Sequence, residues 1–278
     1  MKNPTYYNGI ISPFEAASIP LFDRSFFFAD AVYDVMIGRN KKVYQYSEHM
    51  QRLRKNCDAT GLSLLYTDTD ISQIITELTD ISDYDEFMVY IHVSGRSERR
   101  AHRRDGGVGN LFISLTQISL PRVPNTLSAK LIPDKRYDYC NIKTTNLLPS
   151  VLSLSEVGDD QTDIAIFHRD GRITEASYAN VFICKNEKLL TPPLSNRLLP
   201  GITRSNIIKL SAKVGIACEE KEISTQDLLD ADEIFFSSTT KLVQQCNKIS
   251  GYERIFEENK LVKRVFSLLL EDFLRYTT

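Results

Sequence analysis

Three short segments in the second half of the chain carry side chains that could act together on an organic cofactor. Lys143 begins Lys-Thr-Thr-Asn, Glu175 ends Ile-Thr-Glu, and residues 201–204 read Gly-Ile-Thr-Arg. A lysine amine can form an imine, a carboxylate can hold a proton on a pyridine nitrogen, and a helix start can bind a phosphate through its free N–H groups. Pyridoxal 5′-phosphate requires these three capacities of a protein.

Each segment has an ordinary explanation when it is taken alone. Most lysines are solvated, a carboxylate at the end of a hairpin strand is commonly exposed, and Gly-Ile-Thr-Arg would suit many helix starts. The surroundings favour the chemical interpretation. We expect Lys143 to lie between a strand and the apolar start of a helix. A second polar turn at 237–240 follows an apolar strand, so two turns could hold one phosphate.

Apolar periodicity in the first 118 residues predicts a mixture of helices and strands. Tyr46, Met50, Leu53 and Cys57 predict a helix, with Ser47 as its cap and Gly61 as its stop. The same reasoning predicts another helix and two strands, at 71–78, 87–93 and 111–115.

Beyond residue 126, short strands dominate the expected structure. Two prolines within residues 120–125 indicate a linker, so we expect domains at 1–118 and 127–278 joined by 119–126. A turn at Asp170 and Gly171 separates two of the strands. The expected strands are 164–167, 173–175, 180–184, 188–191 and 233–237, and the expected helices are 147–156, 205–214 and a closing helix from Val262.

Composition excludes several classes of protein. The 278 residues are 42% hydrophobic and 25% charged, with a formal net charge of −2, which is typical of a soluble globular chain and argues against a nucleic-acid binder. The longest apolar runs are shorter than the roughly 18 residues of a membrane span, so we expect a cytoplasmic protein. The 5 cysteines and 4 histidines lack the spacing of a disulfide framework or a metal site, and we expect no metal.

The order and spacing of the three segments resemble the fold-type IV aminotransferases, the class IV family that includes D-amino-acid and branched-chain aminotransferases and aminodeoxychorismate lyase. The resemblance implies an α+β fold with a small α/β N-terminal domain and a larger pseudo-barrel C-terminal domain. It implies pyridoxal 5′-phosphate as cofactor, Lys143 as the catalytic Schiff-base lysine and Glu175 at the pyridine nitrogen. The remaining cofactor contacts that it implies are Arg52, Leu199, Ile202, Thr203, Thr239 and Thr240.

Substrate preference is carried by the N-terminal half. Residues 28–34 resemble the family's Phe-Gly-Asp-Gly-Val-Tyr-Glu stretch, and residues 99–102 resemble the Pro-Arg-Ala-His of D-amino-acid aminotransferases. In an extended segment Arg100 and His102 point to one side, and with the Tyr33 hydroxyl they could bind a substrate carboxylate. In the resembled enzymes this pair reaches into the neighbouring subunit's site, which implies a homodimer with active sites near the subunit interface.

These residues predict transamination between a D-alanine-like D-amino acid and a 2-oxo acid. Departures from the family pattern leave the pocket size open: Ala29 and Ala31 replace glycines, and Asp34 replaces a glutamate. Aminodeoxychorismate lyase is the main alternative, favoured if the Arg-Ala-His segment points to solvent. A branched-chain aminotransferase is disfavoured because a Gly-Gly pair is absent near Lys143. A catalytically silent protein of this fold is the alternative from another class.

Overall fold

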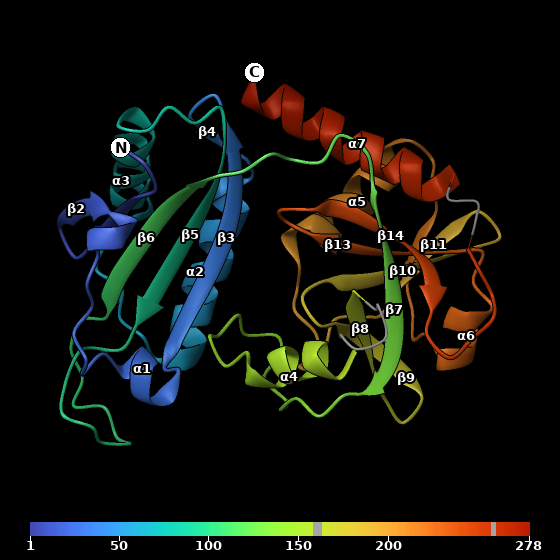
Figure 1. Cartoon of the computed structure of the whole chain (residues 1–278), viewed down its shortest axis with the longest axis horizontal. Helices are drawn as coiled ribbons and strands as arrows, with labels where there is room; N and C mark the ends of the chain where they lie inside the picture. The colour runs from blue at the N-terminus through green and yellow to red at the C-terminus, as the bar shows by residue number, and fades with distance from the viewer. Residues whose placement is uncertain (158–162, 257–259) are drawn as a thin grey trace. The chain divides into compact units, whose positions relative to one another are not determined.

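The computed structural model describes residues 1–157, 163–256 and 260–278, which form two compact units (Figure 1). The first unit contains residues 1–120, 142–146 and 274–278. The second contains residues 121–141 and 147–273. The short segment around Lys143 therefore belongs to the first unit, although the chain on either side of it belongs to the second.

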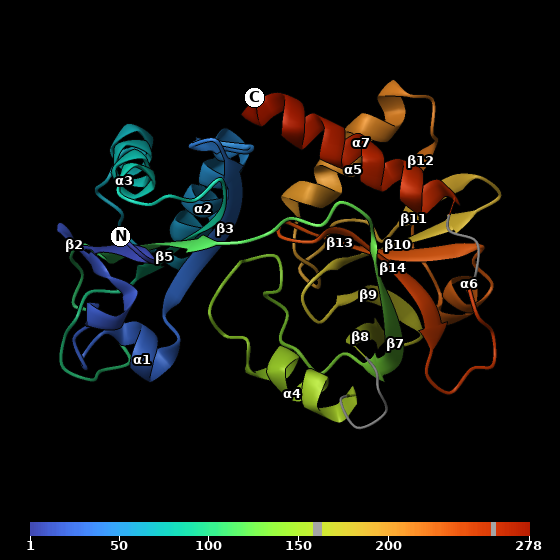
Figure 2. The same ribbon diagram turned by 45° about the horizontal axis from the view of Figure 1, so that its top comes forward.

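The first unit is built on an antiparallel sheet in the order β2-β1-β6-β5-β3-β4, of which Figure 2 labels β2, β5 and β3. Its longest strands lie at the centre, where β5 pairs with β3 along its whole length. The strand bounds are β1 Pro4–Tyr7, β2 Ile10–Pro13, β3 Ala31–Arg39, β4 Lys42–Val43, β5 Glu86–Ser94 and β6 Asn110–Gln117. The alternation predicted for 87–93 is confirmed, because every second residue of β5 enters the core.

Two helices cover one face of this sheet, α2 (Tyr46–Thr60) and α3 (Asp68–Asp80). Their apolar stripes join the inward residues of β3, β5 and β6 in one core cluster. Gly61 ends α2 as expected, but Ser47 lies inside the helix, whose N-cap is Gln45 without a side-chain cap. A short 3-10 turn (Phe14–Ala16) and helix α1 (Arg24–Phe28) precede β3.

The second unit is a sheet that curls back on itself. Its strand order is β12-β11-β10-β13-β14-β7-β8-β9, with parallel pairs at β11–β12, β14–β7 and β7–β8. Arg172 at one edge bridges to Ser224, just past the strand at the opposite edge, and the Ile173 N–H donates to the Ile223 carbonyl at 2.8 Å. This closure confirms the expected strand-rich pseudo-barrel. The strand bounds are β7 Asn125–Pro133, β8 Ile164–Arg169, β9 Arg172–Ala176, β10 Asn180–Lys185, β11 Lys188–Thr191, β12 Cys218–Glu220, β13 Glu233–Ser238 and β14 Leu242–Ile249.

Among the residues that the structure describes, four helices accompany this sheet: α4 Leu148–Val157, α5 Ile202–Lys213, α6 Thr225–Leu229 and α7 Lys260–Thr277. The closing helix buries the apolar stripe expected from Val262 onward. Sequence periodicity did not reveal β14, and β7 begins at Asn125, inside the stretch 119–126 that we expected to be a linker. In the parts of the chain that the structure describes, none of the helices combines the length and apolar character that a membrane span requires.

Candidate active site

Lys143 is held against the start of β3 rather than by a strand of its own. Thr144 bridges to Val32, and the Tyr33 N–H donates to the Lys143 carbonyl at 2.9 Å. The expected strand before Lys143 is absent, because residues 138–142 form turns, whereas α4 follows as expected. The lysine is half-buried, and its Nζ lies 4.2 Å from the centre of the Tyr33 ring. The amine therefore lies beside the proposed substrate tyrosine.

Arg52 is a buried member of a charged cluster on α2 and β3. Its Nε and Nη2 each donate to a different oxygen of Asp34 at 2.8 Å, and His49 Nδ1 lies 2.7 Å from Asp34 Oδ1. The alternative of a solvated surface arginine is therefore wrong, since only 7% of the Arg52 side chain is exposed. This bidentate pairing fixes the plane of the guanidinium.

Electrostatics in this cluster favour a charged aspartate and a neutral histidine. Burial alone would raise the pKa of Asp34, but the charge of Arg52 and the hydrogen bonds from His49 and Arg52 outweigh it and hold this pKa well below its usual range. Burial lowers the pKa of His49, with Asp34 acting in the opposite direction. At neutral pH a neutral His49 would then donate its Nδ1 proton to Asp34.

Glu175 lies on β9 and is buried rather than exposed at a sheet edge. Arg136 Nη1 donates to Glu175 Oε1 at 2.5 Å, and the Leu199 N–H donates to Oε2 at 3.0 Å. Asn180 Nδ2 also lies 3.4 Å from Oε2. Burial raises the pKa of this carboxyl, while Arg136 and the Leu199 N–H act in the opposite direction. Leu199 thus contacts the proposed cofactor glutamate through its backbone.

Arg136 was not among the residues singled out from the sequence. Its Nε and Nη2 donate to the two oxygens of Asp134, each at 3.0 Å, and its guanidinium stacks 4.3 Å from the centre of the Phe167 ring. Nothing local marks it, because its partner Glu175 lies 39 residues further along the chain. Arg136 therefore pairs with two buried carboxylates, and Arg169 Nε lies 3.5 Å from one of them, Asp134.

The two proposed phosphate segments flank Asn180. This residue pairs with Ser237 across β10 and β13, and its Nδ2 donates to the Leu199 carbonyl at 2.9 Å. Gly201 caps α5 with no side-chain hydrogen bond, so the N–H groups at this helix start are available to an anion. A Cβ on Gly201 would clash with Asn180 Oδ1, so a larger residue here would force that side chain to move.

Polar side chains near these segments fit a bound ligand. Thr203 is buried in the first turn of α5, and Thr239 and Thr240 are half-buried just beyond β13. Within the described residues, the buried hydroxyls of Ser177 and Ser237 have no hydrogen-bond partner. Buried hydroxyls without partners are uncommon in folded proteins, so a polar ligand is a natural partner for them.

Arg100 and His102 lie in the connection between β5 and β6, and both are exposed. Each packs on Phe28, with the Arg100 guanidinium 5.2 Å and the His102 ring 5.3 Å from the centre of the Phe28 ring. Exposure to solvent was the condition that favoured the lyase. A segment that reaches into a neighbouring subunit is also exposed in an isolated chain, so exposure alone does not separate the two functions.

His102 lines a cavity of about 600 Å³ together with Thr144 and Asn146, which follow Lys143 in the chain. The cavity lies within the first unit. Its lining combines charged groups with apolar and amide side chains, including Arg24, Phe28, Asp30, His102, Thr144 and Asn146. Such a mixture suits a small polar ligand.

Comparisons with known proteins agree over nearly the whole chain. A family model described as amino-transferase class IV matches residues 31–249. The D-alanine aminotransferase of Bacillus licheniformis is 30% identical over 248 residues, 88% of each chain. The branched-chain amino acid aminotransferase of Escherichia coli has a TM-score of 0.90 at 21% identity, covering 100% of this chain and 97% of its own. A PLP-bound aminotransferase from Brucella abortus has a TM-score of 0.89 at 20% identity, covering 98% and 99%.

Proposed function

The chain belongs to the class IV aminotransferases, and on that premise we propose that it transfers the amino group of a D-amino acid such as D-alanine to a 2-oxo acid. The observation that carries this choice is the Arg100–His102 pair, which resembles the carboxylate-binding pair of D-amino-acid aminotransferases. The 30% identity to a D-alanine aminotransferase supports it. The solved structures, near 20% identity, support the fold-type IV fold alone.

The cofactor of this family is pyridoxal 5′-phosphate, which when bound supplies an aldehyde for attachment to an amine and a pyridine ring that withdraws electrons from the substrate. We assign the attachment to Lys143, whose amine would afterwards take the proton from the substrate Cα as general base. Glu175 would hold the proton on the pyridine nitrogen, with Arg136 keeping this carboxylate oriented.

The phosphate contacts are assigned to two polar segments and one arginine. The first turn of α5 offers the N–H groups of Ile202 and Thr203 and the Thr203 hydroxyl. Thr239 and Thr240 add hydroxyls beyond β13. The guanidinium of Arg52 supplies the positive charge, and its pairing with Asp34 sets its orientation.

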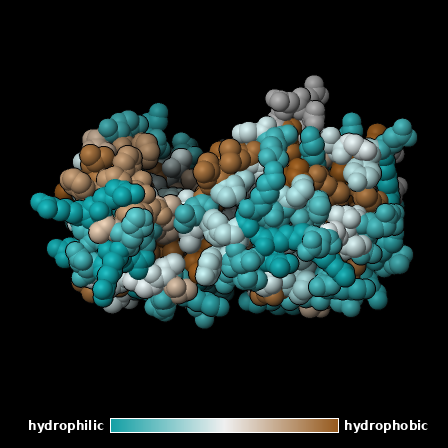
Figure 3. Space-filling model, turned by 90° about the horizontal axis from the view of Figure 1, so that it is seen from below, coloured by the Kyte–Doolittle hydropathy of each residue, from teal (hydrophilic) through white to brown (hydrophobic). Residues whose placement is uncertain are grey.

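Substrate binding is assigned to Tyr33, Arg100 and His102, acting on the substrate carboxylate. We propose that two copies of the chain form a homodimer, in which the 99–102 segment of one copy serves the other. Large apolar side chains between residues 10 and 26 support this proposal, since Ile10, Leu21 and Phe26 are each at least 64% exposed. Figure 3 shows apolar side chains exposed on one face of the molecule.

The test is a single-turnover reaction of the purified holoenzyme with D-alanine, L-alanine or L-leucine. Loss of the visible absorption band of the bound cofactor with D-alanine alone is the expected result. Bleaching by the L-amino acids alone would instead indicate a branched-chain type of enzyme. Pyruvate release from aminodeoxychorismate, without bleaching by any amino acid, would establish the lyase and overturn the proposal.

We also propose a cytoplasmic location. All five cysteines are free thiols, and Cys57, Cys184 and Cys246 are buried. Free thiols are typical of proteins from reducing compartments. Fractionation of cells that produce the protein would test this proposal, and recovery outside the cytoplasm would contradict it.

A further inference from the structure

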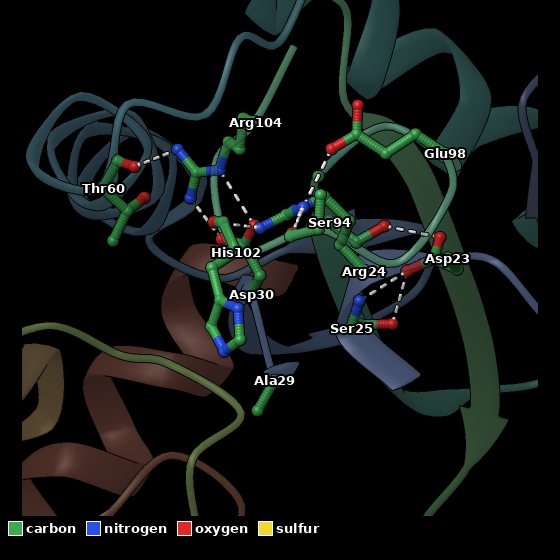
Figure 4. Close-up of polar contacts among 12 residues, drawn as sticks. Asp23, Arg24, Ser25, Ala29, Asp30, Thr60, Ser94, Glu98, His102 and Arg104 are labelled. Carbon is green, nitrogen blue, oxygen red and sulfur yellow. Dashed lines mark hydrogen bonds and ion pairs between the residues drawn. The ribbon is translucent and has the colours of Figure 1, made fainter. Parts of the chain in front are cut away.

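The side chain of Arg24 contacts the loop that contains Arg100 and His102, and Figure 4 shows it among Asp30, Glu98 and His102. Arg24 is the first residue of α1, and only 5% of its side chain is exposed. Its guanidinium donates from Nη1 to the Ala101 carbonyl at 2.7 Å and from Nη2 to the His102 carbonyl at 3.1 Å. A buried arginine therefore binds the backbone of the two residues that follow Arg100.

Two carboxylates pair with Arg24, one in the loop and one just before β3. Its Nε donates to Asp30 Oδ2 at 2.6 Å, and its Nη1 donates to Glu98 Oε1 at 2.8 Å. Glu98 belongs to the loop itself, whereas Asp30 lies just before β3. The hydrogen bonds of this guanidinium thus connect the loop to the start of β3.

A second arginine, Arg104 at the far end of the loop, also binds the carboxylate of Asp30. Arg104 bonds both oxygens of Asp30, and its Nη1 donates to the Thr60 carbonyl at the end of α2. Burial would raise the pKa of Asp30, but the hydrogen bonds and charges of Arg104 and Arg24 outweigh it and lower this pKa. Asp30 therefore remains charged and accepts hydrogen bonds from both Arg24, which contacts the loop, and Arg104, which belongs to it.

The backbone that carries Arg24 is itself fixed to the sheet. Asp23 caps α1 by accepting from the Ser25 N–H, and its other oxygen accepts from Ser94 Oγ at 2.8 Å and Asn110 Nδ2 at 2.7 Å. A Cβ on Gly95 would lie 2.9 Å from the Arg24 Cδ, so glycine leaves room for this side chain. The position of Arg24 is thus set by β5 and β6.

Phe28, on the same helix, contacts the functional side chains directly. Its ring centre lies 4.8 Å from the Arg24 guanidinium and 5.2 Å from the Arg100 guanidinium, and the His102 ring packs on it as well. Helix α1 therefore contacts the loop backbone through Arg24 and the loop side chains through Phe28.

We propose that Arg24 is a positioning residue for substrate binding, which fixes the 98–104 loop so that Arg100 and His102 meet the substrate carboxylate. This inference rests on the proposed function, since it takes Arg100 and His102 as the carboxylate-binding groups. Arg24 itself does not touch substrate. Its loss should leave the cofactor contacts intact and disturb the substrate contacts.

The experiment compares the Arg24→Gln holoenzyme with the wild type in steady-state kinetics. Loss of hydrogen bonds from a charged donor to two carbonyls should raise the KM for D-alanine by at least about tenfold, with kcat changed less than about threefold and the cofactor band retained. Arg54→Gln is the matched control. Arg54 also donates to two backbone carbonyls, those of Leu64 and Tyr66, and to the carboxylate of Asp68, but none of these groups belongs to the loop. Equal KM values for wild type and Arg24→Gln would overturn the proposal.

A double-mutant cycle separates positioning from a general structural role. When Arg100→Gln has already removed the carboxylate contact, adding Arg24→Gln should raise the KM by less than about threefold further. Fully additive effects would show that Arg24 acts independently of Arg100. If Arg24→Gln does not fold, Arg24→Lys replaces it, because a lysine keeps the charge but cannot bond both carbonyls with one planar fork.

Limited trypsin digestion tests the anchoring without any substrate. The exposed bonds after Arg99, Arg100 and Arg103 should be cut at least about fivefold faster in Arg24→Gln than in wild type or Arg54→Gln. Unchanged cleavage would show that Arg24 does not hold the loop. If the wild type does not turn over D-alanine, the proposed function fails, while the digestion still decides whether the anchor exists.

Discussion

Lys143 and Tyr33 are joined through both backbone and side chain. The Tyr33 N–H donates to the Lys143 carbonyl at 2.9 Å, and the Lys143 Nζ lies 4.2 Å from the centre of the Tyr33 ring. The segment around Lys143 is thereby an additional partner of β3, the strand that also holds Asp34. The proposed cofactor lysine and the proposed substrate tyrosine consequently share one rigid support.

Replacing Lys143 with alanine should abolish both the visible cofactor band and transamination, because the amine that attaches the cofactor and moves the Cα proton is removed. Absorption spectra of the purified protein and the half-reaction with D-alanine are the measurements. Lys188→Ala is the control, since Lys188 is exposed at the start of β11. A band of unchanged position and intensity in Lys143→Ala would remove Lys143 from its assigned role.

Replacing Arg136 with methionine should destabilise the protein by about 3 to 5 kcal/mol, because Asp134 and Glu175 would remain as buried carboxylates without this partner. Urea unfolding gives the difference. The control is Arg172→Met, whose pair with Glu222 is more than half exposed and should contribute less than about 1 kcal/mol. Equal losses of stability in the two variants would mean that the contacts of Arg136 with Asp134 and Glu175 do not stabilise the fold.

Elements with a regular local pattern could be predicted from the sequence. The stripes of α2 and α3 and the alternation of β5 were readable because burial there follows the period of the element. Strand β14 escaped notice because Gln244, Gln245, Asn247 and Lys248 interrupt its apolar pattern. Its burial also depends on the parallel pairing with β7, a strand that lies far outside any local window around β14.

The residues of the candidate site also differ in whether a local sequence pattern identifies them. Lys143, Glu175 and Gly201 were recognisable from short motifs, whereas the groups that hold such residues in place were not. Arg136 and Glu175 are 39 residues apart, and Arg24 is 77 residues from Ala101, so only the fold brings each pair together. Charged residues of this kind look like ordinary surface groups until their burial is known.

Replacing Gly201 with alanine should weaken binding of the cofactor by at least about tenfold, because the new methyl group would collide with Asn180 Oδ1 at the helix start assigned to the phosphate. Titration of the cofactor-free protein with pyridoxal phosphate measures the affinity. Adding Asn180→Ala removes the colliding atom, so the double variant should bind more tightly than the sum of the two single losses predicts. Strictly additive losses would show that the effect of Gly201→Ala does not arise from its contact with Asn180.

Asp34 should make the stability of the protein depend on acid pH. Its pKa is held below the unfolded value of about 3.9, so its stabilising effect is complete above that pH and is lost as the pH falls toward the lower folded pKa. Asp34→Asn leaves Arg52 buried without its carboxylate, which should cost about 3 to 5 kcal/mol at pH 7. This cost should shrink below about pH 4, because Asp34 of the unfolded wild type then takes up a proton while the folded aspartate stays charged, so the free energy of unfolding of the wild type falls toward that of Asp34→Asn.

Urea unfolding of the cofactor-free protein between pH 7 and pH 3 measures this dependence. Asp85→Asn is the control, because Asp85 is 65% exposed and lies 3.7 Å from Arg39, so its loss should change stability by less than about 0.5 kcal/mol throughout. A difference between wild type and Asp34→Asn that stays constant down to pH 3 would show that the buried Asp34–Arg52 pair does not govern the acid sensitivity. A shrinking difference would instead connect acid stability to the arginine assigned to the phosphate.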